Sequence, residues 1–329
     1  MENKDWEYRK VLAMSDVPIK GTYRFNDLFQ ILPAEEKAPK PPYVLAHHPC
    51  IIEFRFKIDK TPRQRFDGYK SEQWIVNNDD ARKVLKEIFL LMNLFSFHHI
   101  FDYYPSQSWF IPMGNDKIED AQWGQSGYWY DGFETKINTF SDGNYDLIAL
   151  IDTNKYLTQY GRIIGQGFDL PDRIDMLLTQ YFKLLDSKKQ IFLSACSLFN
   201  QGRKLWSEHP SLSFTALVSS LETLIEVDFK KTKVASCKEC GEKKYTLTEK
   251  FRDFFGKYGS PSPEFREYAT KIYKQRSKIL HTGKLFLGEV EPIRFGSWAG
   301  IDDDQFRRNV VTTCRICMIN WLLKQNNSK

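Results

Sequence analysis

The stretch SPEFREYATKIYKQRSKILHTG, residues 262–283, decides the interpretation of the C-terminal half of the chain. Ser262 suits a helix N-cap, Pro263 suits a first helical turn, and Gly283 suits the position just after a helix. Between them, apolar residues recur every three or four positions, which predicts an amphipathic helix. Arg276 falls on the apolar stripe, where a guanidinium is costly to bury unless it is paired. The pattern therefore predicts a helix with a charged residue on its buried face.

Helical spacing continues on both sides of this stretch. Residues 213–227 carry apolar side chains at intervals of three and four, which indicates a second buried helix face. Further helices are predicted from the same periodicity at residues 171–186, 188–206 and 246–255, and a last helix follows Asp302–Asp304 and continues to about residue 325. The chain is thus expected to be all α from Pro171 onward.

The first part of the chain has a mixed pattern. Residues 52–58 alternate between apolar and polar side chains, which predicts a strand. Residues 80–91 show helical spacing after Asp80, a residue that suits an N-cap. Short strands are predicted at residues 99–104, 109–113 and 127–139, and a turn at residues 141–144.

The change of pattern predicts two domains. The glycine cluster at residues 161–167 lacks the GxGxxG spacing of dinucleotide-binding loops, so we interpret it as a linker. The expected fold class is α+β, with a mixed α/β domain at residues 1–165 followed by an all-α helical bundle at residues 171–329.

Bulk composition limits the classes of protein. With 329 residues, 42% hydrophobic and 15% aromatic, the chain is typical of folded domains and not of disordered proteins. Residues 1–20 mix charged and apolar side chains, unlike a signal peptide. The longest apolar run, residues 88–101, is too short to cross a bilayer. We therefore expect a soluble, cytoplasmic protein with no membrane partner.

The net charge of +5 is unevenly distributed. Residues 171–329 carry 27 Lys and Arg against 18 Asp and Glu, a balance of +9. The rest of the chain carries 20 basic against 24 acidic residues, a balance of −4. A polyanionic partner is therefore expected to meet the second half.

The segment from Arg276 to His281 resembles the Arg-x4-His motif of the HEPN ribonuclease family, with polar Ser277 after the arginine and Gly283 after the histidine. The phrase FTALVSSLETL, residues 214–224, resembles a helix of the branch related to the ApeA anti-phage proteins. The resemblance covers roughly residues 188–324. The N-terminal half resembles that branch only in arrangement, as a variable domain before an all-α HEPN-like bundle.

The resemblance implies a metal-independent endoribonuclease that needs no cofactor for catalysis. His281 would transfer protons as general base or acid, and Arg276 would bind the phosphate as negative charge accumulates on it. Ser277 and Glu222 are the supporting residues. The implied role is anti-phage defence by abortive infection, or a toxin, held inactive until a phage-derived trigger engages the N-terminal domain or an antitoxin leaves.

The spacing of the motif raises a geometric problem. Five residues along a straight helix turn the second side chain about 140° away from the first. Arg276 and His281 of one chain therefore converge only if the helix bends or ends between them. Because HEPN proteins usually dimerise so that two motifs face one cleft, we expect a homodimer that binds RNA.

Two alternatives remain open at this point. Instead of a catalytic role, Arg276 would have a structural role and pair with Glu222, while His281 would end the helix. In that case the chain is a non-catalytic HEPN dimer that binds RNA or a protein partner, or a regulator that senses a nucleotide or another ligand and whose HEPN fold is only a scaffold.

The cysteines suggest a metal site and not a disulfide scaffold. Cys237 and Cys240 form one CxxC pair, and Cys314 and Cys317 form a second pair on the last predicted helix. Together these four residues are predicted to hold a structural zinc ion. The alternative is that Cys314 and Cys317 are core residues, because cysteine packs as a small hydrophobe.

Histidines and aromatic residues of the N-terminal half allow two further interpretations. Residues 47–50 and 98–99 include four histidines and would form a metal site if their strands adjoin, or else are ordinary packed or surface residues. The aromatic residues between Trp109 and Phe133 form a sheet core or stack on bases or a small ligand.

Overall fold

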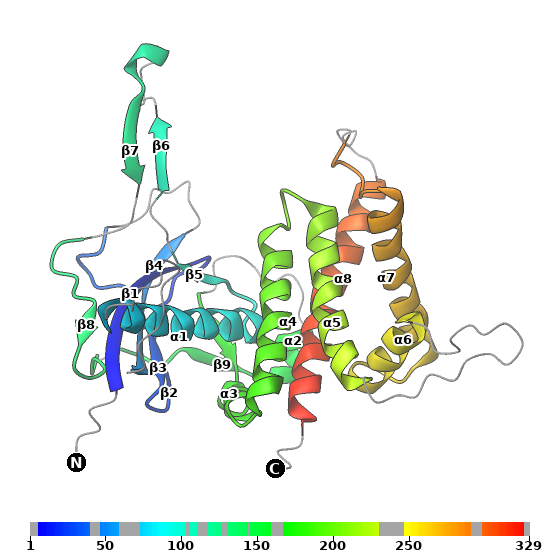
Figure 1. Cartoon of the computed structure of the whole chain (residues 1–329), viewed down its shortest axis with the longest axis horizontal. Helices are drawn as coiled ribbons and strands as arrows, with labels where there is room; N and C mark the ends of the chain where they lie inside the picture. Colours follow the sequence, from blue (N-terminus) through cyan, green and yellow to red (C-terminus); the bar gives the residue numbers. More distant parts are fainter. Residues whose placement is uncertain are drawn as a thin grey trace, which may run out of the picture. The chain divides into compact units, whose positions relative to one another are not determined.

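The computed structural model of the chain is shown in Figure 1. It describes residues 6–39, 47–58, 73–102, 106–110, 117–126, 130–143, 145–158, 167–229, 247–290 and 298–325. The chain groups into two compact units. The first comprises Met1–Met92, Ser96–Leu150 and Ile163–Leu170, and the second comprises Asn93–Phe95, Ile151–Arg162 and Pro171–Lys329. The fold is α+β, while the domains 1–165 and 171–329 stay a prediction.

An antiparallel sheet forms the centre of the first unit. Within the described residues it has six strands in the order β2-β3-β4-β1-β5, with β8 also pairing with β1. The strands are β1 (Trp6–Ser15), β2 (Tyr23–Phe25), β3 (Phe29–Pro33), β4 (His48–Lys57), β5 (Ile100–Asp102) and β8 (Lys136–Ile137). β1 and β4 pair along their whole ten-residue lengths and are the longest strands described.

The other strands of the described chain are short. β6 (Ser106–Phe110) pairs with β7 (Gln122–Ser126), and β9 (Ala149–Ile151) pairs with β10 (Asp169–Pro171). A 3-10 helix, Ile118–Asp120, precedes β7.

The two faces of the six-stranded sheet are covered differently. On one face, Phe54 and Phe56 are each 1% exposed, and the helix α1 (Gln73–Phe95) contributes Asn77, whose amide donates to Glu7 at 2.9 Å. Side chains alternate along a strand, so Lys10 and Glu53, which lie opposite one another on β1 and β4, project from the other face. We call this second face the outer face.

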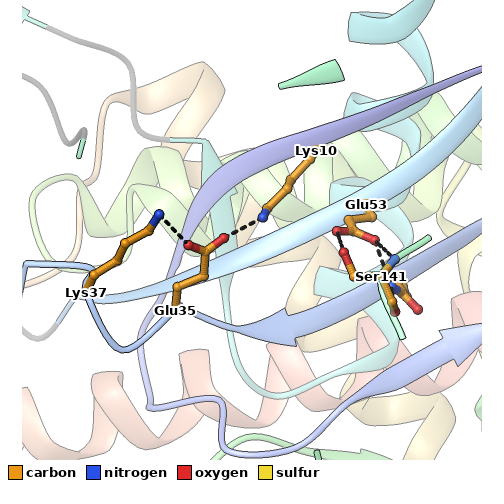
Figure 2. Close-up of polar contacts among 6 residues, drawn as sticks. Lys10, Glu35, Lys37, Glu53 and Ser141 are labelled. Carbon is orange, nitrogen blue, oxygen red and sulfur yellow. Dashed lines mark hydrogen bonds and ion pairs between the residues drawn. The ribbon is translucent and has the colours of Figure 1, made fainter. Parts of the chain in front are cut away.

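Residues 130–143 cover part of the outer face, and we call them the covering segment. Ser141 donates to the Glu53 carboxylate through its backbone N–H at 2.7 Å and through its hydroxyl, and Gln30 donates to the same carboxylate at 2.8 Å (Figure 2). Glu53 is fully buried, so these donors replace the water that the carboxylate has lost. Beside this contact, an apolar cluster joins the covering segment to the sheet through Leu32, Ile51, Tyr130 and Phe133.

A second carboxylate on the outer face is held by two lysines. Figure 2 shows Glu35 between Lys10 and Lys37, with the Lys37 nitrogen 3.3 Å from the carboxylate. Burial opposes ionisation of Glu35, but the hydrogen bonds and charges of Lys10 and Lys37 outweigh it and lower the pKa of this carboxyl. The ionised form of Glu35 therefore stabilises the folded unit.

The second unit is helical. Its helices are α2 (Thr153–Thr158), α3 (Ile174–Phe182), α4 (Asp186–Lys204), α5 (Pro210–Asp228), α6 (Leu247–Tyr258), α7 (Pro263–Thr282) and α8 (Trp298–Leu323). α4 packs along α5, α5 also contacts α7 and α8, and α6 packs on α7 (Figure 1). Within the described residues, no helix combines the length and the apolar character that a membrane span requires.

The helices predicted in the second half are present, with shifted ends. α3 is shorter than the predicted 171–186, because Leu184 and Leu185 leave the helix before α4 begins at Asp186. α8 begins at Trp298, so Asp302–Asp304, which were predicted to precede the helix, lie inside it.

Predictions for the first half were less accurate. α1 spans 23 residues from Gln73, so Asp80 lies inside the helix and the prediction that it is an N-cap is wrong. β1, which with its ten residues is as long as β4, was not predicted. The predicted linker at 161–167 lies outside the described residues except for Gly167, and so do residues 127–129 and Asn144 of the predicted strand and turn.

Close packing of α4 on α5 depends on one glycine. A Cβ atom added at Gly202 would lie 2.6 Å from Leu217 Cγ and 3.0 Å from the backbone oxygen of Ser213. The hydroxyl of Ser213 also donates to the Gly202 carbonyl at 2.6 Å. The two helices therefore approach more closely at this point than any other residue type permits.

Gly202→Ala is expected to destabilise the helical unit by about 1–3 kcal/mol, because the new methyl group overpacks the contact with Leu217. The measurement is urea unfolding followed by circular dichroism at 222 nm. Gly256→Ala, inside α6, is the matched control: its Cβ meets only the flexible Arg266 side chain at 3.3 Å. Helix propensity should make this control neutral or stabilising by up to about 1 kcal/mol. Equal effects of both variants would contradict the packing argument.

Glu35→Gln is expected to lower the stability of the sheet unit by up to about 1 kcal/mol at pH 7. Since the folded-state pKa of Glu35 lies below its ordinary value of 4.5, the stabilisation is present above about pH 4.5 and disappears as the pH falls through the folded-state pKa. Urea unfolding at pH 7, 5, 4 and 3 should show the variant and wild-type curves converging. Glu36→Gln, at an exposed neighbour, should match the wild type throughout. A difference that does not change with pH would contradict the assignment.

Candidate functional site

Helix α7 carries the candidate site and is capped at both ends as its sequence predicts. The Ser262 hydroxyl accepts a hydrogen bond from the Phe265 N–H at 3.2 Å. Gly283 follows the helix with φ of 65°, a left-handed conformation that favours glycine, and its N–H donates to the Ile279 carbonyl. α7 is therefore continuous from Pro263 through Thr282, and both motif residues lie within it.

Arg276 lies on the buried face of α7, as predicted from its position in the apolar stripe. Its neighbours on that face, Ile272 and Ile279, are 0% and 7% exposed, and the Arg276 side chain is 19% exposed. The guanidinium Nη2 donates to Glu222 Oε2 of α5 at 2.9 Å. Glu222 is itself only 16% exposed, so the two charges form a largely desolvated ion pair.

Two further residues surround this ion pair. The Ser219 hydroxyl lies 3.4 Å from Glu222 Oε2 and donates to it. Tyr273 lies near both charges: burial raises the pKa of its phenol, the Glu222 carboxylate raises that pKa further, and the Arg276 guanidinium partly offsets both effects. Sequence reasoning missed Tyr273 and Ser219, although each lies three residues before a residue that was named, one helical turn away.

The ion pair leaves two polar atoms unsatisfied. Within the described residues, Arg276 Nε and Glu222 Oε1 are buried and have no hydrogen-bond partner. Leaving such atoms unpaired costs about 1–3 kcal/mol each, more when they are charged. The pair therefore retains one donor and one acceptor with which a further polar group can bond.

His281 does not converge with Arg276 in this chain. It is exposed in the last turn of α7, and because the helix continues through it, its side chain points about 140° away from that of Arg276. Ser277, half-buried, is adjacent to Arg276 in sequence but rotated by about 100° from it. One chain therefore presents the two motif residues on different sides of one helix.

The side of α7 that carries His281 is basic. A groove of about 580 Å³ runs over α6 and α7 and is lined by Arg252, Glu267, Thr270, Lys271, Lys274, Gln275 and Lys278. Four of these side chains are cationic and one is anionic. His281 follows Lys278 by three residues and Lys274 by seven, so it lies on the same side of the helix. We call Lys271, Lys274 and Lys278 the lysine row.

The four cysteines predicted to bind zinc are described only in part. Cys314 and Cys317 are fully buried on one side of α8, and the Cys314 thiol lies 3.5 Å from the Leu217 carbonyl. Burial raises the pKa of both thiols, which favours the protonated form over the thiolate that zinc binds. Cys237 and Cys240 lie outside the described residues, so the four-cysteine site stays a prediction.

The histidines of the first unit do come near one another. β1 lies between the two pairs of histidines: Ser15 of β1 pairs with His48 on one side and, on the other, with Ile100, the residue after His99. The rings of His47 and His99 both contact Phe101, at 4.9 and 5.5 Å. In the described part of the chain, however, no three His, Cys, Asp or Glu side chains gather in a way that would hold a metal ion.

The aromatic residues between Trp109 and Phe133 separate into two groups. Trp109 and Trp123 lie opposite each other in the β6–β7 ribbon. Tyr130 and Phe133 are buried against the sheet. The sheet-core interpretation therefore holds for the second group, and Tyr128 and Trp129 lie outside the described residues.

Comparisons of the chain with models of protein families, with curated proteins and with solved structures found no match.

The Arg276–Glu222 pair is expected to contribute a coupling energy of about 1–2 kcal/mol to the stability of the helical unit, because both charges are largely desolvated. The measurement is a double-mutant cycle of Arg276→Ala and Glu222→Ala by urea unfolding. The control cycle uses Arg308 and Asp304 of α8, whose side chains are 38% and 37% exposed and should couple by only about 0.3–0.5 kcal/mol. Similar coupling energies in both cycles would show that burial adds nothing at the α5–α7 contact.

Proposed function

We propose that the protein is a metal-independent endoribonuclease of the HEPN type, acting in anti-phage defence by abortive infection or as a toxin. The observation that carries the proposal is the exposed His281 at the end of the lysine row. A polyanion that follows the cationic groove on α6 and α7 meets the His281 imidazole, a group that can accept or donate a proton. This arrangement supports RNA as the substrate, because RNA carries both the phosphate and the 2′-hydroxyl that the chemistry needs.

In the proposed reaction the RNA 2′-hydroxyl attacks the adjacent phosphorus. His281 takes the 2′ proton as general base and passes it, as general acid, to the 5′ oxygen as the bond between phosphorus and the 5′ oxygen breaks. The products are a 2′,3′-cyclic phosphate and a 5′-hydroxyl end, so atoms balance without water or metal. Arg276 would stabilise the charge that builds on the phosphate oxygens, through the donors that Glu222 does not occupy.

The proposed active site is composite. Since Arg276 and His281 of one chain point to different sides of α7, the site needs the arginine of one copy and the histidine of another. A homodimer therefore belongs to the proposal. The N-terminal unit is then the module that a phage-derived trigger or an antitoxin engages.

A second candidate function is a non-catalytic HEPN dimer that binds RNA or a protein partner. It is favoured by the ion pair at 2.9 Å, which gives Arg276 a structural role and occupies one of its nitrogens. In this case the lysine row binds the phosphate backbone and no bond is broken. The two functions differ in one observable, cleavage in the presence of a chelator.

Purified protein is expected to cleave RNA in EDTA and to leave cyclic-phosphate ends, identified by mass spectrometry. His281→Ala and Arg276→Ala should each lower the rate by about 100-fold or more. His209→Ala, at another exposed histidine of the helical unit, is the control and should cleave as the wild type does. Binding without cleavage by all four proteins would support the second candidate instead.

Mixing the two inactive variants tests the composite site. After subunit exchange, half of the dimers pair an Arg276→Ala chain with a His281→Ala chain, and one of their two sites is intact. The mixture should recover up to about a quarter of wild-type activity. No recovery, despite subunit exchange confirmed by native mass spectrometry, would contradict a site shared between chains.

A further inference from the structure

The first unit contains a cavity on the outer face of its sheet. The cavity has a volume of about 510 Å³ and is lined by Trp6, Glu7, Tyr8, Arg55, Lys136, Ile137 and Asn138. This volume lies within the range of about 300–1,000 Å³ that is usual for small-molecule sites. All of its lining residues belong to β1, β4, β8 and the residue after β8.

Strand register explains why these side chains meet. Tyr8 lies opposite Arg55 of β4 and opposite Ile137 of β8, so these three side chains project from the same face. Trp6 lies two residues before Tyr8 and therefore shares that face. The floor of the cavity is thus a row of side chains held by backbone pairing.

The covering segment forms one side of the cavity. Its residues Lys136 and Ile137 pair with β1, and the Lys10 N–H donates to the Thr135 carbonyl at 2.8 Å. Further along the same segment, Ser141 is held by the buried Glu53 (Figure 2). The covering segment is therefore attached to the sheet at residues 135–137 and again at Ser141, and the cavity is formed before any ligand arrives.

The charges that line the cavity favour an anion. Glu7 and Lys136 project from the face that α1 covers, because Glu7 lies opposite Phe56 and Lys136 lies opposite Arg9. The Glu7 carboxylate is bonded there: Arg9 donates to one oxygen at 3.1 Å and Asn77 donates to the other at 2.9 Å. Among the described residues that line the cavity on the outer face, Arg55 is a cation and none is an acid that would neutralise it.

Arg55 is positioned as a ligand-binding residue. Its guanidinium lies over the Trp6 ring, 4.7 Å from the ring centroid. Its Nε atom is buried and has no hydrogen-bond partner within the described residues. An unsatisfied buried donor is costly, and a guanidinium stacked on an aromatic ring presents its fork of donors to an oxyanion such as phosphate.

We propose that this cavity binds a nucleotide, with the phosphate at Arg55 and the planar base against the aromatic side chains of Trp6 and Tyr8. Asn138 supplies an amide that can both donate to and accept from the edge of a base. A free mononucleotide and the terminal nucleotide of an RNA share this chemistry. The site lies in the sheet unit, does not include Arg276 or His281, and goes beyond the proposed cleavage function.

The test is isothermal titration calorimetry on the full chain carrying His281→Ala, so that RNA cleavage does not interfere. The probes are AMP, GMP, CMP and UMP, the matching nucleosides, inorganic phosphate, and a short RNA with a 5′-phosphate. At least one nucleotide should bind more tightly than both its nucleoside and inorganic phosphate. Tighter binding of the RNA would identify an RNA end as the source, and equal or weaker binding of the RNA would identify a free nucleotide.

Variants then locate the binding. Arg55→Ala should weaken the nucleotide by about ten- to a hundredfold, because a charge-assisted hydrogen bond is lost. Arg55→Lys, which keeps the charge but not the planar fork of donors, should weaken it by about two- to fivefold. The matched controls Arg82→Ala and Lys86→Ala remove exposed charges from α1 and should bind as the parent does.

Three results would overturn the proposal. One is no binding of any nucleotide at millimolar concentration by a protein whose circular dichroism shows that it is folded. Another is binding of inorganic phosphate as tight as that of every nucleotide, because the aromatic side chains would then play no part. The last is nucleotide binding that Arg55→Ala and Arg55→Lys both leave unchanged. None of these results depends on whether the protein cleaves RNA.

Discussion

A charge that leaves water must be paired or hydrogen-bonded, and this constraint organises both units of the protein. In the sheet unit, the fully buried Glu53 carboxylate is satisfied by Ser141 and Gln30, which attaches the covering segment to the outer face. In the helical unit, the Arg276–Glu222 pair joins α7 to α5. Burial of these groups is possible only because residues distant in sequence supply the partners, so the partners and the tertiary structure depend on each other.

The two sides of α7 have different physical roles. The side with Arg276 packs against α5, and its guanidinium stabilises the bundle while keeping one donor unpaired within the described residues. The opposite side carries the lysine row and His281, which are exposed. A single chain therefore separates Arg276, the proposed phosphate-stabilising group, from His281, the proposed proton-transferring group. Any chemistry that needs both must bring two copies together, which is why the proposed nuclease activity and the proposed dimer depend on one another.

The outer face of the sheet shows the same principle with a different result. Where the covering segment lies over Glu53, polar groups are matched and the face is closed. Towards Trp6 the cation Arg55 meets no acid among the described residues that line this face, and the face is hollowed. Matched charges give stability, whereas a buried donor without a partner is the feature that a ligand can satisfy. The cavity follows from how far the covering segment extends over the sheet.

Much of the helical half could be predicted from the sequence, whereas the sheet half was predicted in part, at β4, β5 and α1. The caps at Ser262 and Gly283, the apolar stripe and the burial of Arg276 depend on contacts three or four residues apart, so they are visible in the sequence. β1 was missed because pairing with other strands stabilises it: it pairs with β4, β5 and β8, and no local periodicity indicates those partners. The Glu53–Ser141 bond joins residues 88 positions apart, and the surroundings of Tyr273 depend on a helix about 50 positions earlier.

The sequence by itself determined the helices, their caps and the inward position of Arg276, because short-range geometry decides them. Only the tertiary structure decided which charges meet, that His281 lies apart from Arg276, and where the sheet is left open, because these depend on long-range packing.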